Sequence, residues 1–141
     1  MARVSGGAVA AAGAAGFLVG PIWYGPLLFG GAYGALLGPE AGAAARAGPS
    51  PGEMIAEFLR VLLVALVLAR LLADLGIDRR PRALALGLRV WLGFQATLLL
   101  GAVLHEGMPP ALYAIHAGDA LAKTLVMAAI LGGWPRPPAG K

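Results

Sequence analysis

Charged residues, aromatic residues and cysteine are all scarce in this chain. Only 13% of its 141 residues are charged, whereas charged residues make up about a quarter of an ordinary soluble domain. Such a small charged fraction excludes a normal water-exposed surface. The absence of cysteine excludes disulfide bonds, thiolate catalysis and cysteine-ligated metal centres. The chain is therefore predicted to lie in a lipid bilayer.

Hydrophobic residues, by contrast, make up 59% of the chain and occur in long runs. Each run is long enough to cross a hydrocarbon layer of about 30 Å. The runs predict a single all-α domain, an integral membrane four-helix bundle, with spans at residues 7–29, 54–75, 83–104 and 110–133. Residues 38–52, which are mostly Gly, Ala and Pro, are predicted to form a flexible loop.

The net charge of +4 comes from basic residues that are scattered at loop ends, a pattern that argues against nucleic acid as a partner. Four spans place both termini and the central turn on one side of the membrane. That side carries Arg3, Arg79, Arg80, Arg82, Arg136 and Lys141. The other side carries Arg46 with Glu40, Glu53 and Glu106. By the positive-inside rule, we expect a multi-pass protein of the inner (plasma) membrane with cytoplasmic N- and C-termini.

Several helix ends can also be predicted. Ser50 and Glu53 have the spacing of a capping box, with a proline between them at the first helical position. Gly76 is placed for a left-handed C-cap at the end of the second span. In the first span, Pro21 and Pro26 each remove a backbone donor. We therefore expect that helix to kink or end near Trp23 and Tyr24, which suit the membrane interface.

Small residues recur every fourth position in two of the predicted spans. In the first span they are Ala12, Gly16 and Gly20, and in the third Gly93 and Gly101 lie on one ridge with Arg89 and Thr97. Small residues at this spacing let another helix approach closely. Both ridges are predicted to be packing faces.

The last span carries three polar groups, His116, Asp119 and Lys123, on one helical face. A charge at mid-membrane costs about 2.5–3.5 kcal/mol on the insertion scale, so this face must meet protein or water. Arg60 of the second span, which can pair with Glu57 at i, i+3, lies at a depth similar to that of His116, in the outer half. The four residues are predicted to form an intramembrane polar cluster. Asp119 and Lys123 fit either an ion or proton relay or a self-neutralising i, i+4 pair.

No catalytic, cofactor-binding or metal-ligating residue is predicted. His105, Glu106, His116 and Asp119 are ligand types, but the first two sit at the interface and the others lie at least one turn deeper. The two histidines do not match in depth, as a bis-histidine haem would require. Ser50 is explained as a helix cap rather than a nucleophile. We expect no enzymatic activity and no cofactor.

Four stretches also resemble a known family. They are Gly20–Gly30 (GPIWYGPLLFG), Trp91–Phe94, Glu106–Gly107 and Leu125–Trp134. In this order they are similar to the blocks of the bacterial membrane protein family catalogued as domain of unknown function 1761. The signature positions are Trp23, Tyr24, Pro26, Trp91, Glu106 and Trp134. The resemblance implies four transmembrane helices and brings no chemistry. The family usually has asparagine in place of His116 and uncharged residues in place of Asp119 and Lys123. The resemblance therefore implies that these charges are either a subtype feature or a local compensation.

Two function hypotheses follow from these patterns. In the first, the protein binds or conducts a small solute or ion through Arg60, His116, Asp119 and Lys123. Four short helices enclose little volume, so transport would call for a homo-oligomer. In the second, it is a structural or accessory membrane protein that assembles through its small-residue faces. A metal-dependent membrane enzyme is a third and more remote hypothesis.

Overall fold

The computed structural model describes residues 4–135, and every regular element among them is a helix. The elements are α1 (Gly6–Trp23), α2 (Gly30–Leu36), α3 (Pro39–Ala47), α4 (Pro51–Asp74), α5 (Arg80–Val90), the π-helical segment η1 (Trp91–Ala96), α6 (Thr97–His105) and α7 (Pro110–Gly133). The all-α prediction is confirmed for this part of the chain.

Three helical stretches are long and apolar enough to cross a membrane: α1, the continuous helix Arg80–His105 and α7. Helix α4 has 24 residues and is long enough, but it is not among these candidates. Charged side chains are spread along it, at Glu57, Arg60 and Arg70. Helix α4 can therefore form a fourth membrane span only if its charged side chains have partners within the protein.

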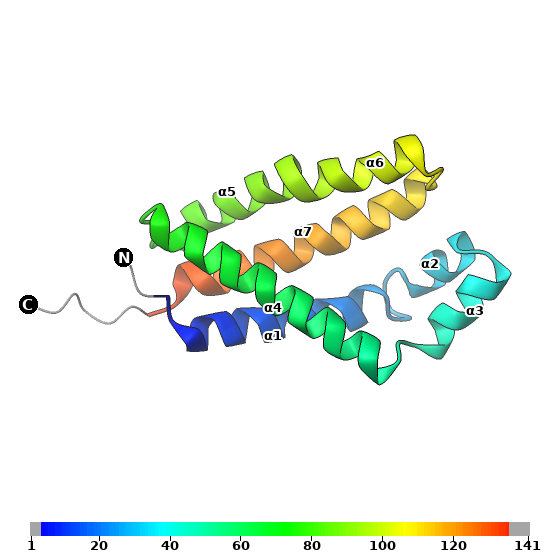
Figure 1. The fold of residues 1–141 in the computed structure, drawn as a ribbon, viewed down its shortest axis with the longest axis horizontal. Coiled ribbons are helices and arrows are strands. Elements are labelled where there is room, and N and C mark those ends of the chain that lie inside the picture. Colours follow the sequence, from blue (N-terminus) through cyan, green and yellow to red (C-terminus); the bar gives the residue numbers. More distant parts are fainter. Residues whose placement is uncertain (1–3, 136–141) are drawn as a thin grey trace, which may run out of the picture.

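Helix α7 is the centre of the fold, with α1 packed on one side and α5 on the other (Figure 1). Helix α4 crosses α1 and α7 obliquely and meets α5 near the α4–α5 turn. The hydrophobic core joins α1, α4, α5 and α7, and its largest fully buried apolar side chains are Leu72 and Met127. The start of α1 and the end of α7 lie at the same end of the molecule, where a side chain at Gly7 would lie 3.6 Å from the ring of Trp134.

The first helix is shorter than the predicted span 7–29. Helix α1 ends at Trp23, as the two prolines predicted, and the chain then turns sharply before α2. The turn is held by backbone hydrogen bonds from Phe29 N to Trp23 O and from Gly30 N to Gly25 O, both 3.0 Å long. The predicted bound at residue 29 was therefore too late, whereas the expected kink or end near Trp23 and Tyr24 agrees with the structure.

The prediction of a flexible loop at 38–52 was also wrong for most of that range, because α3 occupies Pro39–Ala47. The segment is rich in alanine, the best helix former, and Pro39 stands at the first helical turn, where it costs no hydrogen bond. Helix α3 packs closely on α2, since a side chain at Gly42 would collide with the carbonyl oxygen of Gly34. Small residues supply this contact in place of large apolar ones.

The predicted caps of α4 are present. Ser50 Oγ accepts a hydrogen bond from Glu53 N at 3.3 Å, and Glu53 Oε2 accepts one from Ser50 N at 2.7 Å. The bond from Ser50 N, and after it the interaction with the Ser50 side chain, hold the pKa of the Glu53 carboxyl below its ordinary value. Gly76 has a φ of 63°, and Ile77 N donates to Leu72 O at 2.8 Å. Both ends of α4 therefore lie where the sequence predicted them.

The two small-residue ridges behave differently. Ala12 is fully buried, and a side chain at Gly16 would lie 3.0 Å from Val61 and 3.1 Å from Met127, so α1 is a packing face as predicted. At Gly93 and Gly101 a side chain would meet nothing within 4 Å. The ridge on the third predicted span is therefore not a packing face within the described part of the chain.

Candidate functional site

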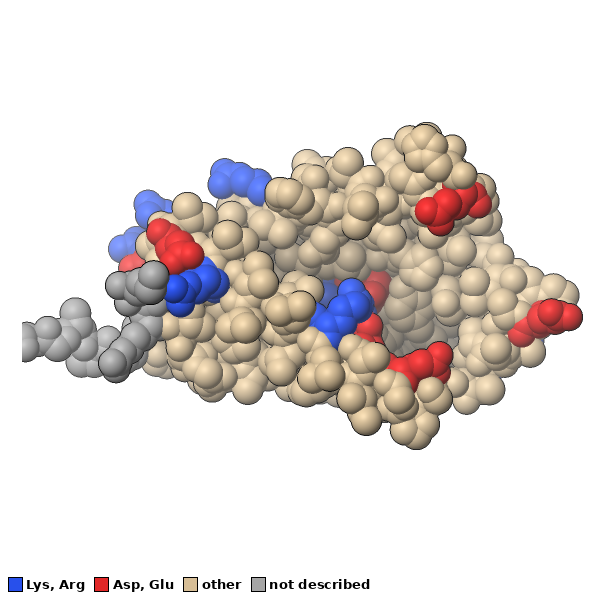
Figure 2. All heavy atoms as spheres, in the orientation of Figure 1, with Lys and Arg blue, Asp and Glu red and all other residues tan. Residues whose placement is uncertain are grey.

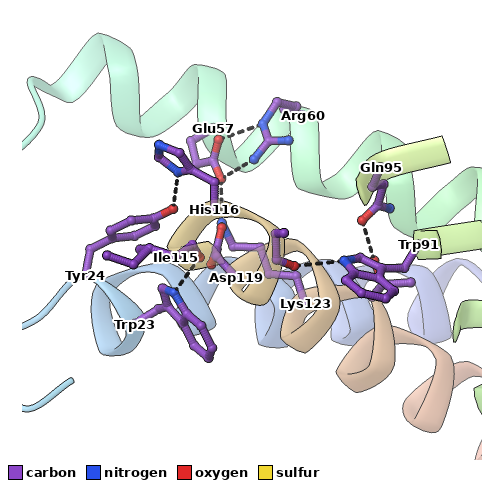
Figure 3. Close-up of polar contacts among 12 residues, drawn as sticks. Trp23, Tyr24, Glu57, Arg60, Trp91, Gln95, Ile115, His116, Asp119 and Lys123 are labelled. Atoms are coloured by element: carbon purple, nitrogen blue, oxygen red, sulfur yellow. Dashed lines mark hydrogen bonds and ion pairs between the residues drawn. The ribbon is translucent and has the colours of Figure 1, made fainter. Parts of the chain in front are cut away.

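Four charged side chains from α4 and α7 form one connected network, which we call the polar cluster: Glu57, Arg60, Asp119 and Lys123. Lys123 Nζ donates hydrogen bonds to Asp119 Oδ2 at 2.8 Å and to Glu57 Oε1 at 3.0 Å. Arg60 donates from Nε and Nη2 to the two oxygens of Glu57, at 2.8 and 2.7 Å (Figure 3). Two positive and two negative charges cancel, which meets the condition for burying charge in a membrane protein.

Burial divides the polar cluster into an inner and an outer half. Asp119 and Lys123 are only 6% and 7% exposed, whereas the side chains of Glu57 and Arg60 are 36% and 62% exposed. The second carboxylate oxygen of Asp119, Oδ1, is buried and has no hydrogen-bond partner among the described residues. A buried acceptor without a donor is costly, and such atoms call for a specific explanation.

Figure 2 shows that the face crossed by α4 is hollowed between α4 and the α5–α6 helix, with basic and acidic side chains at the edge of the hollow. Arg60 reaches the surface of α4, and Glu57 connects it to Lys123 on α7. The polar cluster thus runs from an exposed guanidinium to a buried carboxylate. A small polar species arriving at Arg60 would have charged groups along its way to Asp119.

Aromatic side chains border the polar cluster on the side of α1 and α2. Tyr24 OH lies 2.7 Å from His116 Nδ1, and the rings of Tyr24 and Tyr33 pack edge to face with centroids 4.8 Å apart. The ring of Tyr33 also lies 5.7 Å from that of His116. His116 is therefore held by the turn after α1 rather than by a charged partner.

Two tryptophans hold the turn of α7 that carries His116 and Asp119. Trp23 Nε1 donates to Ile115 O at 3.0 Å from the side of α1, and Trp91 Nε1 donates to Ala117 O at 2.8 Å from η1 (Figure 3). A helical carbonyl has a second lone pair free for such a bond. The two indole groups therefore fix both the depth and the rotation of this turn.

The π-helical segment η1 brings two side chains to α7 at once. Besides the indole of Trp91, Gln95 Oε1 accepts a hydrogen bond of 3.1 Å from Thr124 Oγ1. The backbone widening leaves Leu92 O to accept a bond from Thr97 Oγ1 at 2.7 Å. Single-turn π segments are often found at functional sites. The residue of α7 that Gln95 contacts, Thr124, directly follows Lys123 in the sequence.

The cluster predicted from the sequence did not include Glu57. The sequence had indicated the i, i+3 pair of Glu57 with Arg60 and the i, i+4 pair of Asp119 with Lys123, and both pairs are present. The link between the pairs depends on how α4 crosses α7, which helical spacing within one element does not give. Arg60 meets Lys123 only through Glu57, and His116 bonds Tyr24 instead of the charged residues.

Side chains of the types that bind metal ions do not form a group in the described part of the chain. Within residues 4–135 no group of three or more His, Cys, Asp or Glu side chains is placed to hold a metal ion. His105 and Glu106 are exposed at the end of α6, away from the polar cluster on the middle of α7. The four residues weighed as ligands are therefore not brought together.

The comparison with protein families gives a clear result. A sequence profile of the family described as "Protein of unknown function (DUF1761)" matches residues 7–132. The chain belongs to this family. No curated protein and no solved structure matches it.

In this DUF1761 chain, the signature residues fall into two groups. Trp23, Tyr24 and Trp91 hold the turn of α7 at the polar cluster. Pro26 is exposed in the turn after α1, and Glu106 is exposed after α6. Trp134 packs against the hydrophobic core at the opposite end. In this chain, the first group therefore holds residues 115–117 of α7 in place.

Proposed function

We propose that this chain is a four-span protein of the inner membrane that binds a small solute or ion at the polar cluster and lets it pass. One observation carries the proposal: Asp119 Oδ1 is buried and has no hydrogen-bond partner among residues 4–135, within a network that reaches the surface at Arg60. Intramembrane ionisable groups are expensive to bury and mark ion or substrate pathways. A pair that served only to cancel charge would not need an acceptor left open.

The same arrangement supports α4 as the fourth span. Glu57 and Arg60 bond each other, Lys123 shares Glu57, and Arg70 lies 3.7 Å from Asp74. A helix whose charges are paired costs far less to place in the bilayer than one whose charges are free. With α4 crossing, both termini and Arg79, Arg80 and Arg82 fall on one side.

This topology predicts where reporters will lie. A reporter fused after Lys141 is expected to be cytoplasmic, and one inserted near Ala44 in α3 is expected to be external, because the positive-inside rule places the arginines of the α4–α5 turn in the cytoplasm. Paired alkaline phosphatase and green fluorescent protein fusions at the two sites measure this. Labelling in the opposite sense, or both sites on one side, would overturn the topology.

Single-cysteine labelling tests whether water reaches the polar cluster. The chain has no cysteine, so no background thiol needs to be removed. A side chain at Gly20 would lie 3.6 Å from Lys123 Nζ, an ordinary contact, whereas one at Gly93 would meet nothing within 4 Å. We expect a membrane-impermeant methanethiosulfonate added from outside to modify Gly20→Cys and to leave Gly93→Cys, which would face lipid, unmodified.

The contrary outcome has a clear meaning. If Gly20→Cys stays unmodified in the folded protein and reacts fully after denaturation, the polar cluster is dry. The charges would then form a structural pair, and the binding proposal would fail. Modification of both cysteines would indicate a loosened fold rather than a pathway, which the thermal stability of each variant checks.

A second candidate function, assembly with another copy or an accessory role, is supported by the open ridge of Gly93 and Gly101. Small residues that face no other part of the described chain suit contact between helices of different molecules. Gly93→Leu is then expected to lower the oligomer size and leave the stability of the monomer unchanged. An unchanged oligomer size, measured by light scattering in detergent, would remove this support.

A further inference from the structure

Helices α2 and α3 form a helical hairpin, residues 30–47, with few ties to the rest of the molecule. Within the hairpin the two helices are in close contact, because a side chain at Gly42 would collide with the carbonyl oxygen of Gly34. Towards the other helices, α2 packs on α7, and α3 makes no extensive contact except with α2 within residues 4–135. Among the described residues, the hydrophobic core contains none from the hairpin. The hairpin can therefore move as one unit without opening the core.

Glycines stand at both ends of the hairpin. Gly30 and Gly31 begin α2, and Gly48 follows α3 with a φ of 83°, a conformation that suits glycine. Helix α4 then starts at its own capping box. Hinges of moving segments are a few residues at the ends of elements, often small ones. Both ends are therefore suited to a hinge motion that leaves α1 and α4 in place.

Tyr33 of the hairpin contacts the aromatic residues beside the polar cluster. Its ring centroid lies 4.8 Å from that of Tyr24 and 5.7 Å from that of His116, and its hydroxyl has no hydrogen-bond partner among the described residues. Tyr24 OH in turn lies 2.7 Å from His116 Nδ1 (Figure 3). His116 precedes Asp119 by about one turn of α7. The three rings therefore stand between Asp119 and the end of the molecule at which the hairpin lies (Figure 1).

The contacts of Tyr33 can be released more easily than those of its neighbours. Both of its ring contacts are edge-to-face, and the side chain is only half-buried. Such ring pairs add little beyond the area that they bury. Trp23, by contrast, bonds Ile115 O and packs on Gly118, so the end of α1 is fixed on α7. On this side of α7 the fixed contact is thus Trp23, and the releasable contact is Tyr33.

We propose that the α2–α3 hairpin is a gate on the outer side of the polar cluster, and that the ring of Tyr33 against Tyr24 and His116 keeps the gate closed. This inference rests on the proposed function, because it names the residues that control entry to the same site. When the hairpin turns away, Tyr33 leaves the other two rings. The approach along α7 to His116 and Asp119 is then open to the outer aqueous phase. Tyr24 stays on His116, because it follows α1 directly and lies outside the hairpin.

Distances between spin labels measure the movement. The chain has no cysteine, so Ala44→Cys in α3 and Leu104→Cys in α6, both exposed, can be labelled in the full-length protein in lipid. In double electron–electron resonance, we expect Tyr33→Ala to raise the ratio of open to closed molecules about tenfold, a factor that the loss of two ring contacts can supply. Tyr33→Phe keeps the ring and is expected to leave the distance distribution unchanged. Tyr33→Leu replaces Tyr33→Ala, with the same expectation, if that variant does not fold.

Three results of this measurement would overturn the inference. The first is the same distance distribution in the wild type and in Tyr33→Ala. The second is an equal shift in Tyr33→Phe, because the ring would then not be the closing contact. The third is a broad distribution without a defined second distance, because the hairpin would then lose its structure instead of moving as a unit.

The reaction of Gly20→Cys connects the movement to access. We expect external methanethiosulfonate to modify Gly20→Cys about tenfold faster in the Tyr33→Ala background than in the Tyr33→Phe background. Gly93→Cys should stay unmodified in both. Equal and measurable rates in the two backgrounds would overturn the gate and leave the proposed function standing. If Gly20→Cys reacts in neither background, the proposed function fails, and the spin-label distances still decide whether the hairpin moves.

Discussion

Lys123→Leu is expected to destabilise the protein by about 3–5 kcal/mol, the typical cost of removing one partner from a buried ion pair. The loss removes the counter-charge of Asp119, which is 6% exposed and whose Oδ1 already lacks a donor within the described part of the chain. Glu57 would keep Arg60. The thermal unfolding midpoint and the folded yield in mild detergent measure the effect.

The companion variants make this expectation specific. Asp119→Leu should cost less than Lys123→Leu, because Lys123 would still hold Glu57 Oε1. The double variant leaves the neutral Glu57–Arg60 pair and should recover most of the stability. Arg70→Leu is the matched control, since its i, i+4 pair with Asp74 is exposed and surface pairs contribute at most about 1 kcal/mol. Equal stability of Lys123→Leu and Arg70→Leu would show that Asp119 and Lys123 are not a buried pair.

Trp23→Ala is expected to cost about 3–5 kcal/mol, the usual range for truncating a packed tryptophan. The indole lies against Gly118, where a side chain would come within 2.6 Å of a ring atom, and its ring centroid is 4.7 Å from that of Phe29. Its N–H also bonds Ile115 O. Trp23→Phe keeps most of the packing and loses that bond, at a cost of about 1 kcal/mol.

A double-mutant cycle isolates the contact of Trp23 with Gly118. Gly118→Ala alone must displace the indole, whereas in the Trp23→Ala background the added methyl group has room. The two substitutions are therefore expected to be strongly non-additive. Leu27→Ala, in the same turn and 91% exposed, is the control and should leave the stability near that of the wild type. Additive effects of Trp23→Ala and Gly118→Ala would contradict the proposed support of α7.

The helix ends were the most predictable feature of this fold, because they depend on neighbouring residues. Ser50 and Glu53 cap α4 through bonds that span three residues, and Gly76 ends it through its own φ. The error at α3 has a related cause, since a stretch rich in Gly, Ala and Pro was interpreted by composition. The positions of these residues decide the structure more than their composition does. Gly38 and Gly48 lie just outside the helix, and the alanines lie within it.

Only part of the candidate site could be predicted from the sequence. Each of its two ion pairs joins residues of one helix, whereas the bond that connects the pairs joins two different helices. Spacing along one helix indicated Glu57 with Arg60 and Asp119 with Lys123. The bond from Lys123 to Glu57 joins residues 66 positions apart and depends on the crossing of α4 over α7. The π-helical segment η1 is equally non-local, because Trp91 and Gln95 owe their register to contacts with α7.

Infrared difference spectroscopy of the wild-type protein in lipid tests the central claim, that a small ion binds at the polar cluster. The buffer is exchanged between choline chloride and potassium chloride at constant pH, and the carboxylate bands are recorded. The account predicts a reversible change that persists in Asp74→Asn, a surface carboxylate control, and is absent in Asp119→Asn. A spectrum without any change in the wild type, or an unaltered change in Asp119→Asn, would contradict it.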